Sequence, residues 1–201
     1  MESAVAHLLE SDPIMAEIIR RVGPCQLVPR DPTFETLARS ITFQQLHGNA
    51  AATIFGRVRK AVGRRFTAAA FLRLTPEELR SCGLSRQKIA SLQDLASRVA
   101  SRQISFRKLQ DLPDEEVIAQ LSAVRGVGVW TVQMFLMFAL GRPNVMPTTD
   151  FGIRNAVRKA YGLEGMPTPA EMLLISDKWH PHCTVASWYL WRSLDGPADV
   201  T

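Results

Sequence analysis

LSAVRGVGVWTVQMFLMFALGRPNVMPTTD, from Leu121 to Asp150, is the segment from which the rest of the chain can be interpreted. Its hydrophobic periodicity predicts a helix over about 114–123, a tight turn at Gly126-Val127-Gly128 and a second, apolar helix over about 130–139. Two glycines around one apolar residue let backbone N–H groups approach a ligand closely, and the next helix adds the positive end of its dipole. This arrangement suits a phosphate, although helix–turn–helix corners without a ligand are also common.

Helical periodicity extends along the whole chain. Apolar residues recur at spacings of three and four, and no sustained alternation at period two occurs, so we expect an all-α protein of roughly ten helices. Ser85 is expected to cap a long helix over about 86–102. Other helix starts are indicated by a capping residue or proline at Ser11-Asp12-Pro13, Asp31-Pro32, Thr75-Pro76, Pro113-Asp114 and Thr168-Pro169.

Composition sets limits on the class of protein. The 201 residues carry a net charge of +5, which fits a nucleic-acid-binding protein but equally fits a solvated basic surface. The three cysteines, Cys25, Cys82 and Cys183, are widely spaced, which argues against a disulfide framework and a local metal knuckle. The sequence contains no run of about 18 apolar residues, so we expect no membrane-spanning helix. Met1-Glu2-Ser3 does not resemble the start of a signal peptide, so a reducing, cytoplasmic location is expected.

Two motifs together carry a resemblance to a known family. They are Gly126-Val127-Gly128-Val129-Trp130-Thr131 and Pro147-Thr148-Thr149-Asp150. This combination resembles the DNA glycosylases of the helix-hairpin-helix (HhH-GPD) superfamily, and within it the 3-methyladenine DNA glycosylase II type. The resemblance covers about residues 34–191. It implies two helical subdomains with a cleft between them: residues 34–145, with the hairpin at 114–139, and residues 1–33 together with 146–201.

The resemblance also implies an activity. Such enzymes act in base excision repair, where they flip an alkylated base such as 3-methyladenine or 7-methylguanine out of double-stranded DNA and hydrolyse its N-glycosidic bond. We expect a monomer, because a DNA-scanning enzyme acts on one lesion at a time. Its location would be the cytoplasm, with the nucleoid, in a bacterium and the nucleus in a eukaryote. No cofactor is expected, and the four clustered cysteines of iron–sulfur relatives are absent from the sequence.

Asp150 is the predicted catalytic residue. Taken alone it would be read as a helix N-cap, and that role is compatible with catalysis because a helix N-terminus keeps a carboxylate ionised. A fixed anion can stabilise the positive charge that builds on deoxyribose as the base departs, and it can orient the attacking water. The resemblance places the family's catalytic aspartate at Asp150.

Aromatic residues are the predicted walls of the base pocket. The resemblance places Trp130, Phe151 and Trp191 there, together with Met134, whereas Trp188 is expected to pack inside. Aromatic faces attract cationic alkylated purines with roughly 0.5–2 kcal/mol. Strand-nicking relatives carry a Schiff-base lysine where this chain has Trp130, and an indole cannot form a Schiff base. A monofunctional glycosylase is therefore expected.

Two loops are predicted to bind DNA. In relatives a side chain from the loop corresponding to Gln44-Gln45-Leu46-His47 fills the space left by the extruded base. Gln45 aligns best with that plug, but Leu46 resembles an intercalator and His47 could reach the minor groove, so the three are not separated. In the hairpin, Gly126, Gly128 and Thr131 are candidates for phosphate binding. A monovalent cation, Na+ or K+, is also expected on backbone carbonyls around Ser122, Val124 or Arg125, and Val127.

Two departures and several alternatives stay open. Thr149 replaces an aspartate that many relatives carry before the catalytic one. His180, His182 and Cys183 stand where relatives often have an arginine-containing motif, and their spacing gives only a weak indication of metal. The alternative functions are a glycosylase for uracil, hypoxanthine or oxidised guanine, a non-catalytic helix-hairpin-helix DNA-binding module, and a structural helical protein.

Overall fold

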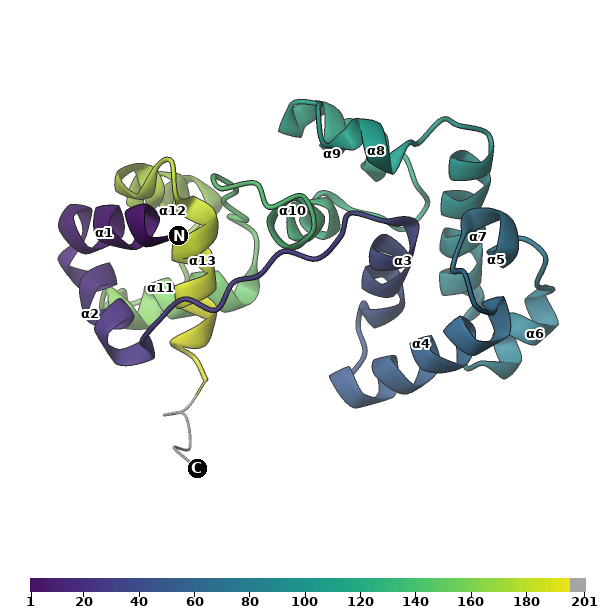
Figure 1. Cartoon of the computed structure of the whole chain (residues 1–201). Helices are drawn as coiled ribbons and strands as arrows, with labels where there is room; N and C mark the ends of the chain where they lie inside the picture. The colour runs from purple at the N-terminus through teal and green to yellow at the C-terminus, as the bar shows by residue number, and fades with distance from the viewer. Residues whose placement is uncertain (196–201) are drawn as a thin grey trace. The chain divides into compact units, whose positions relative to one another are not determined.

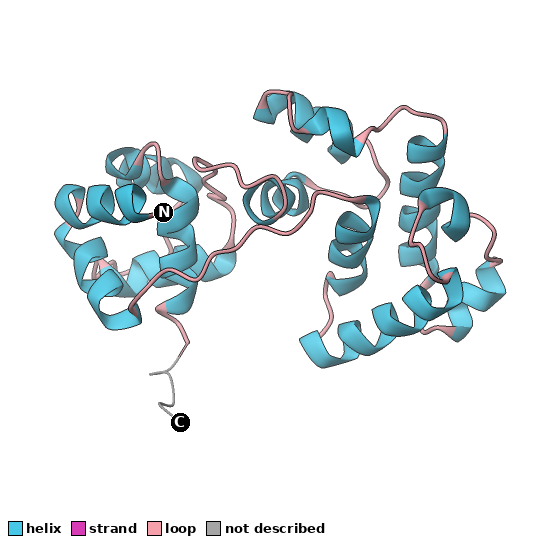
Figure 2. Cartoon of the chain, viewed as in Figure 1, coloured by secondary structure: helices cyan, strands magenta, loops and turns pink. Residues whose placement is uncertain are grey.

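The computed structural model describes residues 1–195, and over that range it consists of helices joined by loops and turns (Figure 2). Thirteen α-helices and one 3-10 helix are found there, so the expected all-α fold is confirmed. The contacts divide the chain into two units. We call residues 30–140 the central unit, and residues 1–29 with the chain from 141 onward the terminal unit. The sequence predicts the corresponding subdomains at residues 34–145 and at residues 1–33 with 146–201.

The central unit contains eight helices, α3 to α10 (Figure 1). Helix α3 packs against α4, α7 and α10, and α9 packs against α10. Leu37, Ile41, Leu92, Leu95 and Phe135 form much of the core between these helices. The bounds are α3 Phe34–Phe43, α4 Gly48–Val62, α5 Ala68–Phe71, α6 Pro76–Ser81, α7 Arg86–Ala100, α8 Phe106–Leu109, α9 Asp114–Ser122 and α10 Val129–Phe138.

The terminal unit combines the first and last helices of the chain. Helix α13 packs against α1, α2 and α11, and the 3-10 helix η1 lies against α1 and α12. Leu8, Met15, Trp179 and Tyr189 are fully buried there, and Trp188 is buried as predicted. The bounds are α1 Glu2–Ser11, α2 Pro13–Val22, α11 Phe151–Ala160, α12 Pro169–Ser176, η1 Asp177–Trp179 and α13 Cys183–Arg192.

Seven of the fourteen described helices begin where a side chain caps them. Ser85 accepts a hydrogen bond from the Lys88 N–H at the start of α7, as predicted. Thr75 and Thr168 form complete capping boxes with Glu78 and Glu171. Asp12 caps α2, and it is also fully buried within the terminal unit. None of the helices described in residues 1–195 is both long and apolar enough to cross a bilayer.

Candidate functional site

The hairpin predicted between residues 114 and 139 is formed by α9, a turn and α10. The Val127 N–H donates to the Val124 carbonyl at 3.0 Å, which closes the turn. Gly126 has a φ of +73°, a conformation that favours glycine, and a Cβ there would lie 2.6 Å from Ser91 Oγ. A Cβ on Gly128, by contrast, would have no atom of residues 1–195 within 4 Å other than those of its chain neighbours, so the space beside this glycine is open. The glycines thus differ: one is required by the backbone, and the other leaves room for a ligand.

The start of α10 presents both exposed and buried candidates. Trp130 is 42% exposed, whereas Thr131 is 4% exposed. The Thr131 hydroxyl accepts a hydrogen bond from Gln44 Nε2 at 3.0 Å. A hydroxyl that accepts one hydrogen bond can still donate its own O–H, so the predicted role of Thr131 in phosphate binding stays a prediction. Met134, one turn further along α10, lines the same cavity as Trp130.

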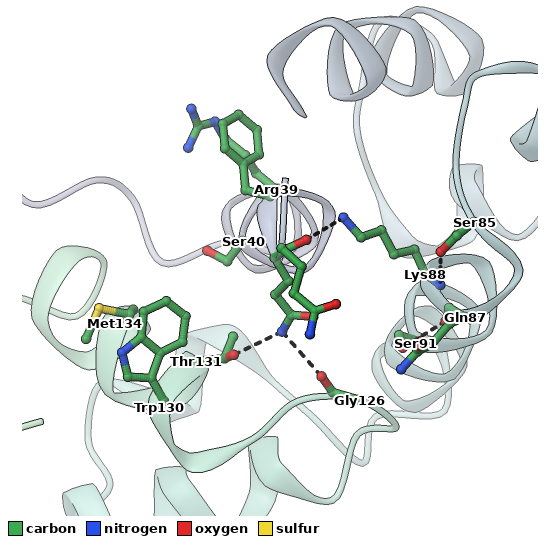
Figure 3. Close-up of a pocket in the computed structure, with 13 residues that line it drawn as sticks. Arg39, Ser40, Ser85, Gln87, Lys88, Ser91, Gly126, Trp130, Thr131 and Met134 are labelled. Carbon is green, nitrogen blue, oxygen red and sulfur yellow. Dashed lines mark hydrogen bonds between the residues drawn. The ribbon is translucent and has the colours of Figure 1, made fainter. Parts of the chain in front are cut away.

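The loop between α3 and α4 contains the predicted inserting residues. Gln45 adopts a φ of +56°, which is uncommon for a residue other than glycine. Gln45, Leu46 and His47 are exposed, but Gln44 is half-buried. The Gln44 side chain turns toward the hairpin and donates to the Gly126 carbonyl at 3.3 Å as well as to Thr131 (Figure 3). Gln44 therefore bonds within the protein, whereas its three exposed neighbours stay candidates for insertion into DNA.

A cavity of about 560 Å³ lies within the central unit beside this loop (Figure 3). The loop between α3 and α4, helix α7 and the hairpin all contribute residues to its wall. Arg39 stacks on Phe43 at its edge, with the guanidinium carbon 3.9 Å from the ring centroid. Lys88 and Ser91, which the sequence did not single out, also line it. On sequence grounds these two look like polar residues on the solvated face of a long helix.

Asp150 is held at the start of α11 in the terminal unit. It is 7% exposed, and its Oδ1 accepts a hydrogen bond from the Ile153 N–H at 2.8 Å, so the predicted N-cap is present. The same oxygen accepts from Trp191 Nε1 on α13 at 3.0 Å. The structure therefore brings together two of the predicted site residues, while their neighbour Phe151 is 73% exposed.

Gly152 is a second residue that the sequence did not single out. A Cβ on Gly152 would lie 3.0 Å from Trp191 Cδ1 and 3.2 Å from Asp150 Oδ1. These distances are shorter than most real Cβ contacts, so a side chain at this position would press on both groups. Glycine in the first turn of α11 thus lets the indole come close to the carboxylate.

The two histidines and the cysteine left open by the sequence have structural partners in the terminal unit. His180 Nδ1 lies 2.8 Å from Asn144 Oδ1 and 3.7 Å from Cys183 Sγ. Burial raises the pKa of the Cys183 thiol to about 12, so it stays protonated at neutral pH. The ring of His182 meets that of His7 edge-on. Within residues 1–195 no group of three or more His, Cys, Asp or Glu side chains could hold a metal ion.

Comparisons with known proteins agree on one family. The family model described as "HhH-GPD superfamily base excision DNA repair protein" matches residues 38–182. The chain is 34% identical to DNA-3-methyladenine glycosylase 1 of Schizosaccharomyces pombe over 96% of this chain and 87% of the relative. A structure of the S. pombe 3-methyladenine DNA glycosylase with abasic DNA matches at a TM-score of 0.83 and 35% identity, covering 94% of this chain and 95% of that one. A DNA-3-methyladenine glycosidase structure from Bacillus halodurans gives a TM-score of 0.83 and 33% identity, with 94% and 87% covered.

Proposed function

We infer that this chain, which belongs to the HhH-GPD superfamily of base excision DNA repair proteins, is a DNA glycosylase of the 3-methyladenine type. The observation that carries the assignment is the placement of Asp150. A DNA-binding module without activity has no need of a carboxylate near anionic DNA. The Asp150 carboxylate is nevertheless buried, caps the N-terminus of α11 and accepts a hydrogen bond from the Trp191 indole N–H. The substrates are alkylated purines in double-stranded DNA.

The proposed chemistry begins with loss of the base. An N3- or N7-alkylated purine is cationic, so when its C1′–N bond breaks, the electron pair neutralises the base and the positive charge moves to the deoxyribose. The carboxylate of Asp150 stabilises that charge. Water then adds to C1′, and its proton passes to Asp150 or to solvent. Because the base leaves as a neutral molecule, no strong general acid is required. The product is an abasic site in an uncut strand.

Trp130 supports a monofunctional enzyme, because its indole carries no amine that could attack C1′ and open the strand. The four residues that are proposed to contact the base are Trp130, Met134, Phe151 and Trp191. For each, the test is the effect of its substitution on release of alkylated bases. Borohydride treatment during the reaction should trap no covalent enzyme–DNA adduct. A trapped adduct would contradict the monofunctional assignment.

The hairpin is proposed to bind a DNA phosphate through the backbone around Gly126 and Gly128, helped by a monovalent cation. The last turn of α9 presents the negative end of the helix dipole. The proposed ligands are backbone carbonyls around Ser122, Val124 or Arg125, and Val127. Within residues 1–195 the buried Ser122 hydroxyl has no hydrogen-bond partner, which supports an oxygen ligand for Na+ or K+ at this turn. The chain is proposed to act as a monomer, in the compartment that holds the DNA.

Release of free bases is the deciding experiment. The purified protein and its Asp150→Asn variant are incubated with DNA that carries radiolabelled methyl groups, and the released bases are separated by chromatography. Wild type should release 3-methyladenine or 7-methylguanine and leave the strand intact until alkali is added. If neither base is released while DNA binding is retained, the lesion assignment is wrong, and uracil and hypoxanthine substrates are tested next.

A further inference from the structure

One face of α7 contacts both loops that are proposed to bind DNA. Lys88, Ser91 and Asp94 are spaced three residues apart, so they follow one another along a single face of the helix. Lys88 contacts the loop between α3 and α4, which we call the inserting loop because it is proposed to insert into DNA. Ser91 and Asp94 contact the hairpin. All three lie in the central unit, as do both loops.

Lys88 holds the loop through its backbone. Its ammonium group donates to the Thr42 carbonyl. It also donates to the Gln44 carbonyl at 2.8 Å, the bond that is dashed beside Lys88 in Figure 3. These carbonyls stand at the C-terminal end of α3, where a cation is favoured by the helix dipole and no basic residue of α3 itself is present. Burial lowers the pKa of Lys88, as expected for an ammonium group drawn away from water toward the protein.

Asp94 holds the hairpin, and Ser91 lies against it. The Arg125 N–H donates to Asp94 Oδ2 at 2.8 Å, and Arg98 donates to both oxygens of the same carboxylate. Gly126 lies so close to α7 that a Cβ would meet Ser91 Oγ at 2.6 Å. The turn proposed to bind phosphate is therefore fixed to the same helix face as the inserting loop.

Gln44 connects Lys88 directly to the hairpin. Its carbonyl accepts from Lys88, while its side chain donates to Gly126 and Thr131 in the hairpin. Gln45 follows immediately with its φ of +56°. A left-handed conformation of this kind costs of order 1–3 kcal/mol and persists only where the surroundings fix it. The hydrogen bonds of Gln44, the residue before Gln45, are the contacts that fix this conformation.

We propose that Lys88 is a positioning residue for base extrusion: with Gln44 it fixes the inserting loop to α7 and the hairpin, so that phosphate binding and insertion occur on one rigid frame. This inference rests on the proposed function only in that the loop inserts into DNA. The competing role, a direct contact from Lys88 to a DNA phosphate, is disfavoured because its ammonium group already donates to two carbonyls.

The first test uses the protein without DNA, so it does not depend on glycosylase activity. Lys88→Met removes the donor but keeps a long side chain, Lys88→Arg retains a donor, and Lys60→Met removes an exposed lysine from α4 as a control. Hydrogen exchange is followed by mass spectrometry in peptides that cover residues 42–49 and 122–131. Lys88→Met should speed exchange in both peptides by about tenfold. Lys88→Arg and Lys60→Met should not. Unchanged exchange in Lys88→Met would overturn the proposal.

The second test separates positioning from chemistry. Single-turnover release is measured for a lesion in a fully paired duplex and for the same lesion in an unpaired bulge, where extrusion costs less. Lys88→Met should slow release about tenfold in the duplex and less than about threefold in the bulge, because only the duplex requires a firmly placed plug. Lys88→Arg should restore the rate. Equal losses on both substrates would contradict a positioning role.

Salt dependence distinguishes the competing role. A lost phosphate contact should reduce the slope of log affinity against log salt by about one. We expect the slope for Lys88→Met to equal that of wild type. If wild type releases no base but Lys88→Met still speeds exchange in both loops, the proposed substrate is wrong. The inference that Lys88 fixes the inserting loop to α7 and the hairpin would then still hold. If wild type is active and Lys88→Met changes neither loop, only the inference fails.

Discussion

Trp191 Nε1 donates a hydrogen bond to Asp150 Oδ1 across 3.0 Å, and the same oxygen accepts the Ile153 N–H. Two donors on one carboxylate oxygen fix the side chain without neutralising it. A carboxylate that is fixed before the reaction needs little reorganisation when positive charge develops on the sugar. The aromatic residue that the sequence assigned to the base pocket therefore also orients the proposed catalytic group.

Asp150→Asn should abolish most excision and leave the fold intact. The amide oxygen of asparagine can still accept both hydrogen bonds, but the negative charge is lost. We expect the single-turnover rate to fall by about a hundredfold or more, the scale at which removal of a transition-state electrostatic contact acts. Affinity for lesion-containing DNA, measured by fluorescence anisotropy, should be retained. Excision at the wild-type rate would rule out Asp150 as the catalytic group.

Trp191→Phe should slow excision by about ten- to a hundredfold, since hydrogen bonds to charged groups contribute about 1.5–3 kcal/mol and each 1.4 kcal/mol is about tenfold in rate. Phenylalanine keeps an aromatic face but cannot donate to Asp150. Trp188→Phe is the matched control, because Trp188 is buried on the same helix and packs edge-on against Tyr189. The control should lower the melting temperature and leave the excision rate of the folded protein near wild type. A larger rate loss in the control than in Trp191→Phe would refute this role.

Gly152→Ala should lower activity through crowding. Alanine adds a methyl group 3.0 Å from Trp191 Cδ1 and 3.2 Å from Asp150 Oδ1, so one of the two groups must shift. Gly56→Ala in α4 is the control, because no atom lies within 4 Å of its added methyl. That variant should gain about 0.5–1 kcal/mol of stability from helix propensity, with unchanged excision. Gly152→Ala should lose excision rate without loss of the fold, as judged by base release and thermal melting. Unaltered release by Gly152→Ala would show that the site tolerates the added methyl.

Local signals explain what could be predicted from the sequence. Helix starts at Thr75, Ser85 and Thr168 follow from hydrogen bonds within four residues, which a sequence pattern contains. The hairpin and the N-cap role of Asp150 are local in the same sense. Helix ends were less accurate: the helix predicted to reach residue 102 ends at Ala100.

Contacts between distant segments explain what was missed. Lys88 and Gln44 meet across 44 positions, and only the fold brings α7 beside the end of α3. From sequence, the Lys88, Ser91 and Asp94 series is indistinguishable from a solvated helix face. Gly152 looked like an ordinary helix residue, because its importance comes from Trp191 on a different helix. Asp12 was predicted as a helix start, but its partners Tyr161 and Trp179 are more than a hundred residues away.

Asp12 should make the stability of the protein depend on pH. Burial alone would raise the pKa of Asp12, but hydrogen bonds from Tyr161, Trp179 and the backbone, with Lys178 nearby, hold it below its ordinary value of 3.8. The unfolded chain therefore takes up the proton first as the pH falls. The stabilisation is present above about pH 4 and is lost at lower pH.

The test of this dependence compares wild type with Asp12→Asn. At pH 7 the variant should lose about 3 kcal/mol of unfolding free energy, because a buried charged network loses one partner. The difference in urea midpoint between the two proteins should shrink as the pH is lowered below 4. A difference that stays constant down to pH 3 would show that the charge of Asp12 does not contribute.

Gly126→Ala and Gly128→Ala should fail in different ways, although the two glycines are equivalent in the sequence motif. At Gly126 the φ of +73° and the contact with Ser91 Oγ at 2.6 Å both oppose a methyl group, so we expect a loss of about 1–3 kcal/mol in stability. At Gly128 the methyl meets no protein atom, so the melting temperature should be unchanged. Its effect should instead be weaker DNA binding, because the methyl occupies the space through which a phosphate reaches the N-terminus of α10. Thermal melting and anisotropy titrations of both variants measure the two quantities. If the Gly128→Ala variant binds DNA as tightly as wild type, the proposal that a phosphate binds beside Gly128 is wrong.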